Sequence, residues 1–361
     1  MVSIDEYEVI LLIIKLVIIL INLILLAENY FKNKNYKSFE KYLMIFFAGI
    51  YILIFAIRPV LPYSDTAVYL YKYEYNLKSL DDILQGGKDI FFFVYSYISK
   101  IIIDDKTVYL FSVALAYLGP LIFALKKFKH PFLLFSLFTL TFSFENLGIN
   151  IIRQGIGLSF FTLGIVLFFN KLKNSYIYFL LAVLFHISLV IPVGIFLIFR
   201  RVKNIYLSAV VLLICSVLSI SNINVIGFVE NIPIISEIFK ERNQNYSEVV
   251  ANYKVGFRPD FFIYNYLFII FGYFTYIKFK FLDIDYKNKY LLVLNTYIVL
   301  SSVFFLMFTQ SFSDRYGVLS WYLVPFLFLP YIQQTKSRIG LINSATIFIF
   351  YAAISLFFTL K

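Results

Sequence analysis

Charged residues are scarce in this chain, and their scarcity excludes a soluble globular protein. Only 15% of the 361 residues are Asp, Glu, Lys or Arg, whereas 61% are hydrophobic, and the mean hydropathy is +0.83. A soluble domain of this length needs far more polar surface to cover its core. The single cysteine, Cys215, lies in an apolar segment, which excludes a disulfide framework and a cysteine-based metal site.

Long apolar segments fill most of the sequence, and several reach the roughly 20 residues that a helix needs to cross a bilayer. They predict an all-α polytopic membrane protein with about ten transmembrane helices, forming one integral membrane domain over residues 1–361. No internal repeat is evident, which argues against an inverted-repeat transporter. The predicted spans are 9–27, 42–60, 107–125, 131–147, 154–170, 205–221, 261–277, 290–309, 318–332 and 342–359.

The net charge of +11 comes largely from short loops between apolar segments, so it indicates membrane orientation and no nucleic-acid partner. Basic loops are expected on the cytoplasmic side of the membrane. The acidic start of the chain and two longer loops, about 62–106 and 222–260, are then predicted outside. The basic clusters are Lys32, Lys34, Lys37 and Lys41; Lys126, Lys127 and Lys129; Lys171 and Lys173; Arg200, Arg201 and Lys203; Lys278, Lys280, Lys287 and Lys289; Lys336 and Arg338.

The apolar segment 175–199 conflicts with this orientation because basic clusters flank both of its ends. It contains His186, Pro192 and Gly194, which could divide it into two half-helices. We therefore predict a re-entrant hairpin that enters from the cytoplasm with His186 near its tip, and a plain kinked span is the alternative. Residues 89–103 are apolar and aromatic but too short to cross, so they predict an interfacial helix in the first outer loop.

Unusual polar residues fall on the outer side under this topology. Arg58 and Asp65 follow the second span, and His186 approaches the same side from below. Two further turns between spans carry charged pairs, Glu145 with Arg153 and Asp314 with Arg315. Guanidinium groups bind phosphate oxygens with two hydrogen bonds and keep their charge, so the arginines are candidates for binding a lipid pyrophosphate.

Each of these residues also has a structural interpretation. Arg153 and Arg315 could be interface anchors, or could pair with Glu145 and Asp314. His186 could be a core histidine held by backbone, or the group that takes a proton near neutral pH. Asp65 could cap the helix that follows it. The tyrosines at 69, 71, 73 and 75 could stack on sugar rings, although aromatic belts are commoner. Lys15 in the first span is expected to snorkel outward, and His130 to lie at the cytoplasmic surface.

The order of these motifs resembles the EpsG-type family of exopolysaccharide proteins and the related Wzy-type O-antigen polymerases. The resembling pieces are D-x-x-x-Y at Asp65–Tyr69, R-Q-x-x-G/A at Arg153–Gly157, A-x-x-F-H-x-S at Ala182–Ser188, and R-Y at Arg315–Tyr316. The resemblance extends from about residue 40 to 335. Gly157 replaces the usual Ala of the R-x-x-x-A pattern, a change that concerns packing more than chemistry.

The resemblance implies a GT-C-like membrane glycosyltransferase of the bacterial inner membrane, which polymerises undecaprenyl-pyrophosphate-linked oligosaccharides at the periplasmic face, as in lipopolysaccharide synthesis. Absence of nucleotide-binding glycines agrees with a lipid-linked donor, and no metal or cofactor is expected. Implied partners are membrane lipids, a chain-length regulator and a flippase. The residues assigned by hypothesis are Asp65, His186 and Glu145 for catalysis, Arg153, Arg315 and Arg58 for pyrophosphate, and Tyr69, Tyr316 and Asp314 for sugar.

Other functions remain open at this point. A flippase for lipid-linked oligosaccharide would also need an arginine-lined cavity, and an O-antigen ligase differs only in its acceptor. A membrane acyltransferase would be expected to carry a paired His and Asp or Asn in one short motif, and an assembly component would lack catalysis altogether.

Overall fold

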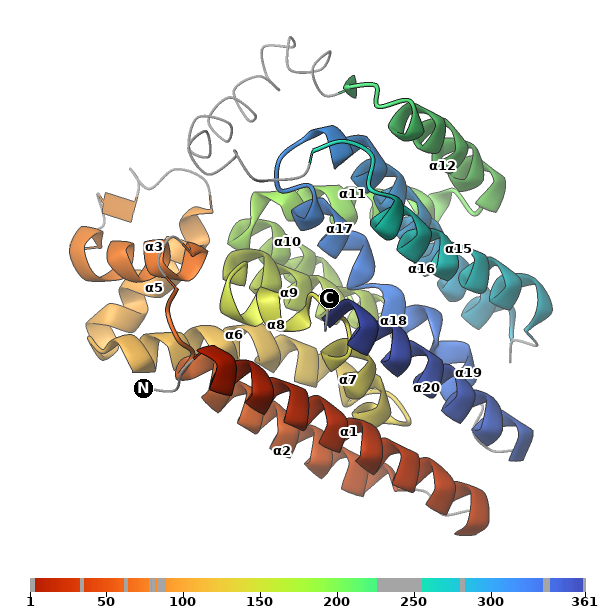
Figure 1. The fold of residues 1–361 in the computed structure, drawn as a ribbon, viewed down its shortest axis with the longest axis horizontal. Helices are drawn as coiled ribbons and strands as arrows, with labels where there is room; N and C mark the ends of the chain where they lie inside the picture. The colour runs from red at the N-terminus through yellow and green to blue at the C-terminus, as the bar shows by residue number, and fades with distance from the viewer. Residues whose placement is uncertain are drawn as a thin grey trace. The chain divides into compact units, whose positions relative to one another are not determined.

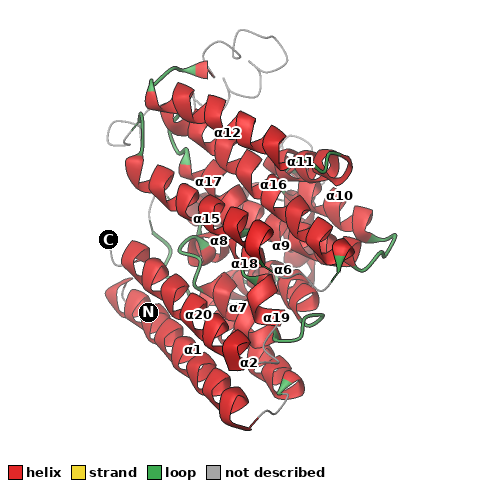
Figure 2. Cartoon of the chain, turned by 90° about the vertical axis from the view of Figure 1, so that its right-hand side faces the viewer, coloured by secondary structure: helices red, strands yellow, loops and turns green. Residues whose placement is uncertain are grey.

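The computed structural model describes residues 4–32, 36–61, 64–77, 79, 82–83, 89–225, 255–279, 283–333 and 338–359. These residues form helices and connecting segments with no strand among them (Figure 2). Most of the predicted outer loop 222–260 lies outside the described residues, as do Lys34, Lys280 and Lys336 of the basic clusters. The helices group into two compact units, residues 1–193 with 328–361, and residues 194–327.

Within the described part of the chain, seven helices are long and apolar enough to cross a membrane: Ile4–Asn29, Lys37–Ala56, Lys106–Leu125, Ile152–Phe169, Pro259–Lys278, Ile284–Thr309 and Ile339–Phe358. By these helices the protein is a multi-pass membrane protein. Each coincides with a predicted span.

The other three of the ten predicted spans are not long helices. Residues 131–147 divide into α7 (Pro131–Thr139) and α8 (Phe144–Ile149). Residues 318–332 divide among α17 (Asp314–Trp321), α18 (Val324–Leu327) and α19 (Leu329–Gln333). The span at 205–221 is α12 (Ile205–Ile220), which has only 16 residues. Hydropathy records that a segment is apolar, but it does not record where a turn interrupts the helix.

The first unit contains α1 (Ile4–Lys32), α2 (Lys37–Ala56), α3 (Asp65–Tyr71), α5 (Ile90–Ile102), α6 (Lys106–Leu125), α7, α8, α9 (Ile152–Phe169), α10 (Ser175–Phe185), α19 and α20 (Arg338–Thr359) (Figure 1). Helix α9 is its central helix, because nearly all of its side chains are buried and it packs against both α6 and α10. Helix α1 packs against α7 and α20 (Figure 2).

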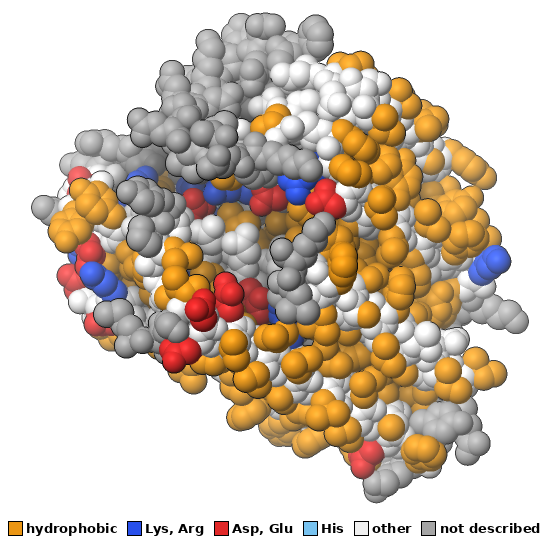
Figure 3. Space-filling model, viewed as in Figure 1, with side chains coloured by type: hydrophobic (Ala, Val, Ile, Leu, Met, Phe, Trp, Pro, Cys, Tyr) orange, Lys and Arg blue, Asp and Glu red, His pale blue; other side chains and the backbone are white. Residues whose placement is uncertain are grey.

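The outer faces of these helices are apolar. Helix α1 exposes large hydrophobic side chains along its length, including Val9, Ile13, Leu20 and Ile24. Figure 3 shows hydrophobic side chains spread over the part of the surface where α1 lies. A helix that is apolar on its outward face as well as its packed face is typical of a membrane span.

Basic residues from two of the predicted cytoplasmic loops lie together at one end of the first unit. At one end, burial and the charges of Lys127 and Lys41 lower the pKa of Lys126, so the ends of α6 and the start of α2 bring basic residues together. His130 is at this end but is not on the surface as expected: it is 4% exposed, and its Nδ1 lies 2.7 Å from Glu40 Oε1. The opposite end carries the polar residues described below.

The second unit contains α11 (Val190–Arg201) from residue 194 onward, α12, α15 (Pro259–Lys278), α16 (Ile284–Leu306), α17 and α18. Helices α12 and α16 run parallel. Ser208 near the start of α12 donates to Asn295 in the middle of α16. Beyond the ends of both helices, Asn224 accepts a hydrogen bond from Thr309. Helix α15 runs antiparallel to α16. Its buried Asn265 accepts hydrogen bonds from Ser301 and Ser320, which ties α15, α16 and α17 together.

The predicted segment 175–199 is broken, as expected, but at one place. Helix α10 ends at Phe185, His186 is extended, and a single turn at Ile187–Leu189 leads into α11. Pro192 and Gly194 lie inside α11 and do not interrupt it. The boundary between the two units falls inside α11, at Val193 and Gly194. The re-entrant hairpin stays a prediction.

Candidate functional site

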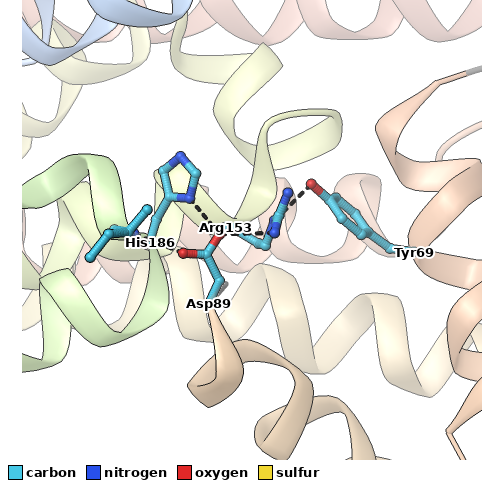
Figure 4. Close-up of polar contacts among 5 residues, drawn as sticks. Tyr69, Asp89, Arg153 and His186 are labelled. Atoms are coloured by element: carbon cyan, nitrogen blue, oxygen red, sulfur yellow. Dashed lines mark hydrogen bonds and ion pairs between the residues drawn. The ribbon is translucent and has the colours of Figure 1, made fainter. Parts of the chain in front are cut away.

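A cluster of polar side chains lies where α9 begins. Arg153 is the second residue of α9, and it meets residues from three other segments: Tyr69 of α3, Asp89 just before α5, and His186 at the end of α10 (Figure 4). These segments are far apart in the sequence, and all belong to the first unit. We call Tyr69, Asp89, Arg153 and His186 the Arg153 cluster.

Asp89 is the centre of this cluster. Its Oδ2 accepts hydrogen bonds from Arg153 Nη1 at 2.8 Å and from His186 Nδ1 at 2.7 Å, and its Oδ1 accepts one from the backbone N–H of Ile187 at 2.7 Å. The carboxylate is only 2% exposed. Burial by itself raises the pKa of Asp89. Three groups outweigh burial and lower the pKa: His186 through its hydrogen bond and charge, Arg153 through its charge, and the Ile187 N–H. Asp89 is therefore ionised at neutral pH.

The backbone at Asp89 is left-handed, with φ of 66°. Asp is one of the few non-glycine residues that adopt this conformation readily. The conformation starts α5 and aims the carboxylate at Arg153 and His186 at the same time. Helix α5 lies where a short interfacial helix was predicted, and its place at a membrane interface stays a prediction. Phe92, Phe93 and Ser96 are buried, whereas Ile98, Ile101 and Ile102 are exposed.

Arg153 is held on two edges of its guanidinium group. Its Nε donates to the Tyr69 hydroxyl at 2.9 Å and its Nη1 to Asp89, and its carbon lies 5.0 Å from the centre of the Tyr69 ring. Its Nη2 makes no hydrogen bond within the described part of the chain, and the side chain is 25% exposed. The group is thus fixed in orientation while it keeps donors for an anionic ligand.

His186 has a defined tautomer. An ionised carboxylate can only accept hydrogen bonds, so the Nδ1 that faces Asp89 must carry a hydrogen. In the neutral ring Nε2 then has a lone pair. Figure 4 shows Nε2 pointing away from Asp89, and the side chain is 20% exposed. Such an imidazole can accept a proton at Nε2 and leave the resulting charge beside a carboxylate.

Glu145 was predicted to be catalytic and Arg58 to bind phosphate. Both are held in buried contacts with other parts of the first unit. Glu145 lies 2.8 Å from Lys15, which is 1% exposed and so does not snorkel outward as expected. Arg58 is 3% exposed and donates to the Gly148 carbonyl at 2.6 Å. Burial lowers the pKa of Arg58 to about 10, which still leaves it charged at neutral pH. Both side chains support the turn that leads to Arg153.

Asp65, also predicted to be catalytic, is the first residue of α3. The capping residue is Ser64, whose side chain accepts a hydrogen bond from Ala67 N–H, so the structure assigns the cap to the neighbour of Asp65. The Asp65 backbone N–H donates to Asn150 at 2.9 Å, and Thr66 donates to the Ile149 carbonyl. Asp65 lies close enough to Arg153 to interact with its charge. Helix α3 is therefore fastened to the turn before α9.

Arg315, Tyr316 and Asp314 belong to the second unit. The Arg315 guanidinium lies 5.3 Å from the centre of the Phe312 ring, and Phe312 adopts a left-handed backbone with φ of 55°. Tyr316 is buried at 8% exposed. All three lie at the start of α17. Their assignment to pyrophosphate and sugar stays a prediction.

Sequence reasoning missed Asp89. It recognised 89–103 as an interfacial helix but gave no role to the acidic residue at its start. The available signal was an aspartate directly before an apolar amphipathic segment in an outer loop, which is a common position for a helix-capping residue as well. Only the contacts distinguish the two roles, because Asp89 makes no capping hydrogen bond to α5.

The fold and this cluster define a helical multi-pass membrane protein with a fixed arginine, carboxylate and histidine at one end of its central helix. A model of the EpsG family matches residues 41–361, and the chain belongs to the EpsG family. That membership implies a role in exopolysaccharide biosynthesis. No curated protein and no solved structure matches the chain.

Gly157 allows α10 to approach α9 closely below the cluster. A Cβ at this position would lie 2.9 Å from the Ala182 carbonyl oxygen and 3.2 Å from the Leu189 side chain. Both neighbours flank His186. We expect Gly157→Ala to displace the α10 end and to lower activity by about tenfold, because misplacement of His186 by a fraction of an ångström weakens its hydrogen bonds. The measurement is exopolysaccharide formation with the variant.

Gly119→Ala is the matched control for this prediction, because a Cβ at Gly119 in α6 would meet nothing within 4 Å. In a helix this change is expected to stabilise by about 0.5–1 kcal/mol. Equal activity of the two variants would show that the close approach at Gly157 does not position His186.

The Lys15–Glu145 pair is expected to stabilise the first unit. Removing one partner of a buried ion pair leaves an unpaired charge, which costs about 3–5 kcal/mol. Lys15→Met and Glu145→Gln should each lower the melting temperature in detergent, and the double variant should recover most of the loss. If Glu145→Gln instead abolished exopolysaccharide formation with an unchanged melting temperature, Glu145 would have a functional role.

Proposed function

We propose that this protein is a polysaccharide polymerase that joins oligosaccharide repeat units carried on undecaprenyl diphosphate, at the outer face of the bacterial cytoplasmic membrane. The observation that supports this most is the Arg153 cluster, in which Asp89 orients an anion-binding arginine and a proton-accepting histidine together. Membership of the EpsG family supports the assignment to polysaccharide synthesis.

The reaction forms one glycosidic bond and breaks one bond to phosphate. A hydroxyl at the nonreducing end of one lipid-linked unit attacks the anomeric carbon of the second glycan. The bond between that carbon and the diphosphate oxygen breaks, and the lipid diphosphate leaves with the electron pair. The hydroxyl proton passes to His186 Nε2, whose imidazolium is stabilised by Asp89. Asp65 is the alternative acceptor for this proton.

Arg153 stabilises the leaving group in this scheme. Negative charge grows on the diphosphate as the bond breaks, and a fixed guanidinium close to that charge lowers the barrier. Because Tyr69 and Asp89 already fix the orientation of Arg153, its remaining donors need no rearrangement during the reaction. Tyr69 then positions Arg153 through this hydrogen bond, and it is also a candidate sugar contact.

The sequence motif alone supports Arg315 as a further diphosphate ligand, with Asp314 and Tyr316 as sugar contacts. A flippase that supplies the lipid-linked unit and a chain-length regulator are the expected partners.

A reconstituted assay tests the function. Purified protein in liposomes is mixed with a lipid-linked repeat unit, without nucleotide sugar or ATP, and products are separated by size. Elongated glycan on lipid diphosphate supports the polymerase. Movement of the lipid between leaflets without a new glycosidic bond would identify a flippase, and transfer only to a different acceptor lipid would identify a ligase.

A further inference from the structure

Lys72 is a second cation beside Arg153 that the proposed chemistry does not yet use. It begins a π-helical turn, Lys72–Asn76, which continues α3. Tyr69 precedes it by three residues, so the two side chains lie on the same face of the helix. Isolated π turns occur frequently at functional sites because they redirect side chains.

Contacts place Lys72 next to the same segment that carries Asp89. Its Nζ lies 4.9 Å from the centre of the Phe93 ring, and Phe93 is in the first turn of α5, four residues after Asp89. On the other side of this turn, Phe92 contacts the ring of Tyr69, whose hydroxyl accepts the hydrogen bond from Arg153. Lys72 and the Tyr69–Arg153 pair therefore both lie beside the first turn of α5.

Lys72 has no carboxylate partner of its own among the residues that the structure describes. Arg153 is bound by Asp89 and also interacts with the charge of Asp65, whereas no described carboxylate lies within ion-pair distance of Lys72. Burial and the positive charge of Arg153 lower the pKa of Lys72. By contrast, the nearby Lys106 pairs with Glu74, and Lys100 donates to the carbonyls of Tyr73 and Glu74.

We propose that Lys72 is a second cationic ligand of the diphosphate, and that Lys72 and Arg153 together select a polyprenyl diphosphate over a polyprenyl monophosphate. This inference rests on the proposed function. An anion between the two cations offsets their repulsion, and a diphosphate offers two phosphate groups where a monophosphate offers one. The partly exposed Lys72 ammonium contributes a mobile point charge, whereas Arg153 contributes a fixed fork.

Direct binding tests this without relying on catalysis. Farnesyl diphosphate and farnesyl monophosphate are titrated into the detergent-purified protein and into Lys72→Gln, Lys72→Arg and Lys106→Gln. We expect Lys72→Gln to weaken diphosphate binding by about tenfold or more, the range of a charge-assisted hydrogen bond, with little change for the monophosphate. Lys72→Arg should restore the preference, and Lys106→Gln should match the unmodified protein.

The outcomes separate this inference from the proposed function. If the unmodified protein binds the diphosphate and Lys72→Gln binds it equally well, Lys72 is not a ligand, whereas the polymerase proposal stands. If Lys72→Gln weakens both lipids equally, Lys72 contributes general charge and selects nothing. Absence of diphosphate binding by the unmodified protein would overturn both proposals. Melting temperatures in detergent show whether each variant is folded before the titrations are compared.

Discussion

Replacing Arg153 by lysine is expected to reduce polymer synthesis by about 100-fold or more, although the positive charge is retained. The guanidinium donates to Tyr69 and to Asp89 in two fixed directions and keeps a third donor for a diphosphate. A single ammonium cannot donate in all three directions at the same time. Loss of one fixed donor to a developing negative charge typically costs this much in rate. The measurement is initial rate of chain elongation with a reconstituted lipid-linked unit.

Arg201→Lys is a suitable control for Arg153→Lys, because Arg201 is an exposed residue at the opposite end of α11 from His186. It should leave the rate unchanged. Wild-type polymer length and rate in Arg153→Lys would remove Arg153 from the site, and with it the main support for a guanidinium-stabilised leaving group.

Asp89→Asn is expected to reduce the rate by about 100-fold or more, the usual contribution of a general base. The neutral amide can donate to His186 Nδ1, which would move the ring hydrogen to Nε2 and remove the lone pair that accepts the proton. It also removes the negative charge beside Arg153. Asp104→Asn, an exposed aspartate in the same outer loop, should retain full activity.

The pH–rate profile distinguishes this role from a purely structural one. In Asp89→Asn, the acidic limb should move to lower pH, because the amide no longer stabilises the protonated imidazole. Because the pKa of Asp89 is lowered, its carboxylate stays ionised over the pH range of the assay and loses its contacts only in stronger acid than an ordinary aspartate would. Its contacts should therefore not vary with pH in the assay. A profile of unchanged shape with reduced height would indicate that Asp89 only holds α5 in place.

Much of the fold was predictable because the requirement for apolar length is local. Seven of the ten predicted spans are long helices, and the short helix at 89–103 and the break near His186 are both present. Two of the three spans that differ contain turns set by packing, and the third is the uninterrupted 16-residue helix α12. Between α7 and α8, for example, the Phe144 carbonyl is bound by Tyr117 of α6, which no periodicity in residues 131–147 reveals.

The candidate site was predictable in part. Arg153, His186 and Tyr69 were selected from the sequence, and they meet in the structure. Lys15 was expected to reach outward, but Glu145 binds it in the interior. Asp89 was overlooked because an aspartate before a helix has an ordinary explanation. Each of these differences concerns which side chains meet across segments that are 60 or more residues apart.

The sequence by itself determined that this is a helical membrane protein with its unusual polar residues at span ends, because bilayer thickness and the cost of buried charge act on each segment separately. Its motif order also indicated the EpsG family, to which the chain belongs. The tertiary structure alone decided that Asp89 joins Arg153 to His186, and that Lys72 lies beside them. Those contacts depend on how α3, α5, α9 and α10 pack, and packing is a property of pairs of segments.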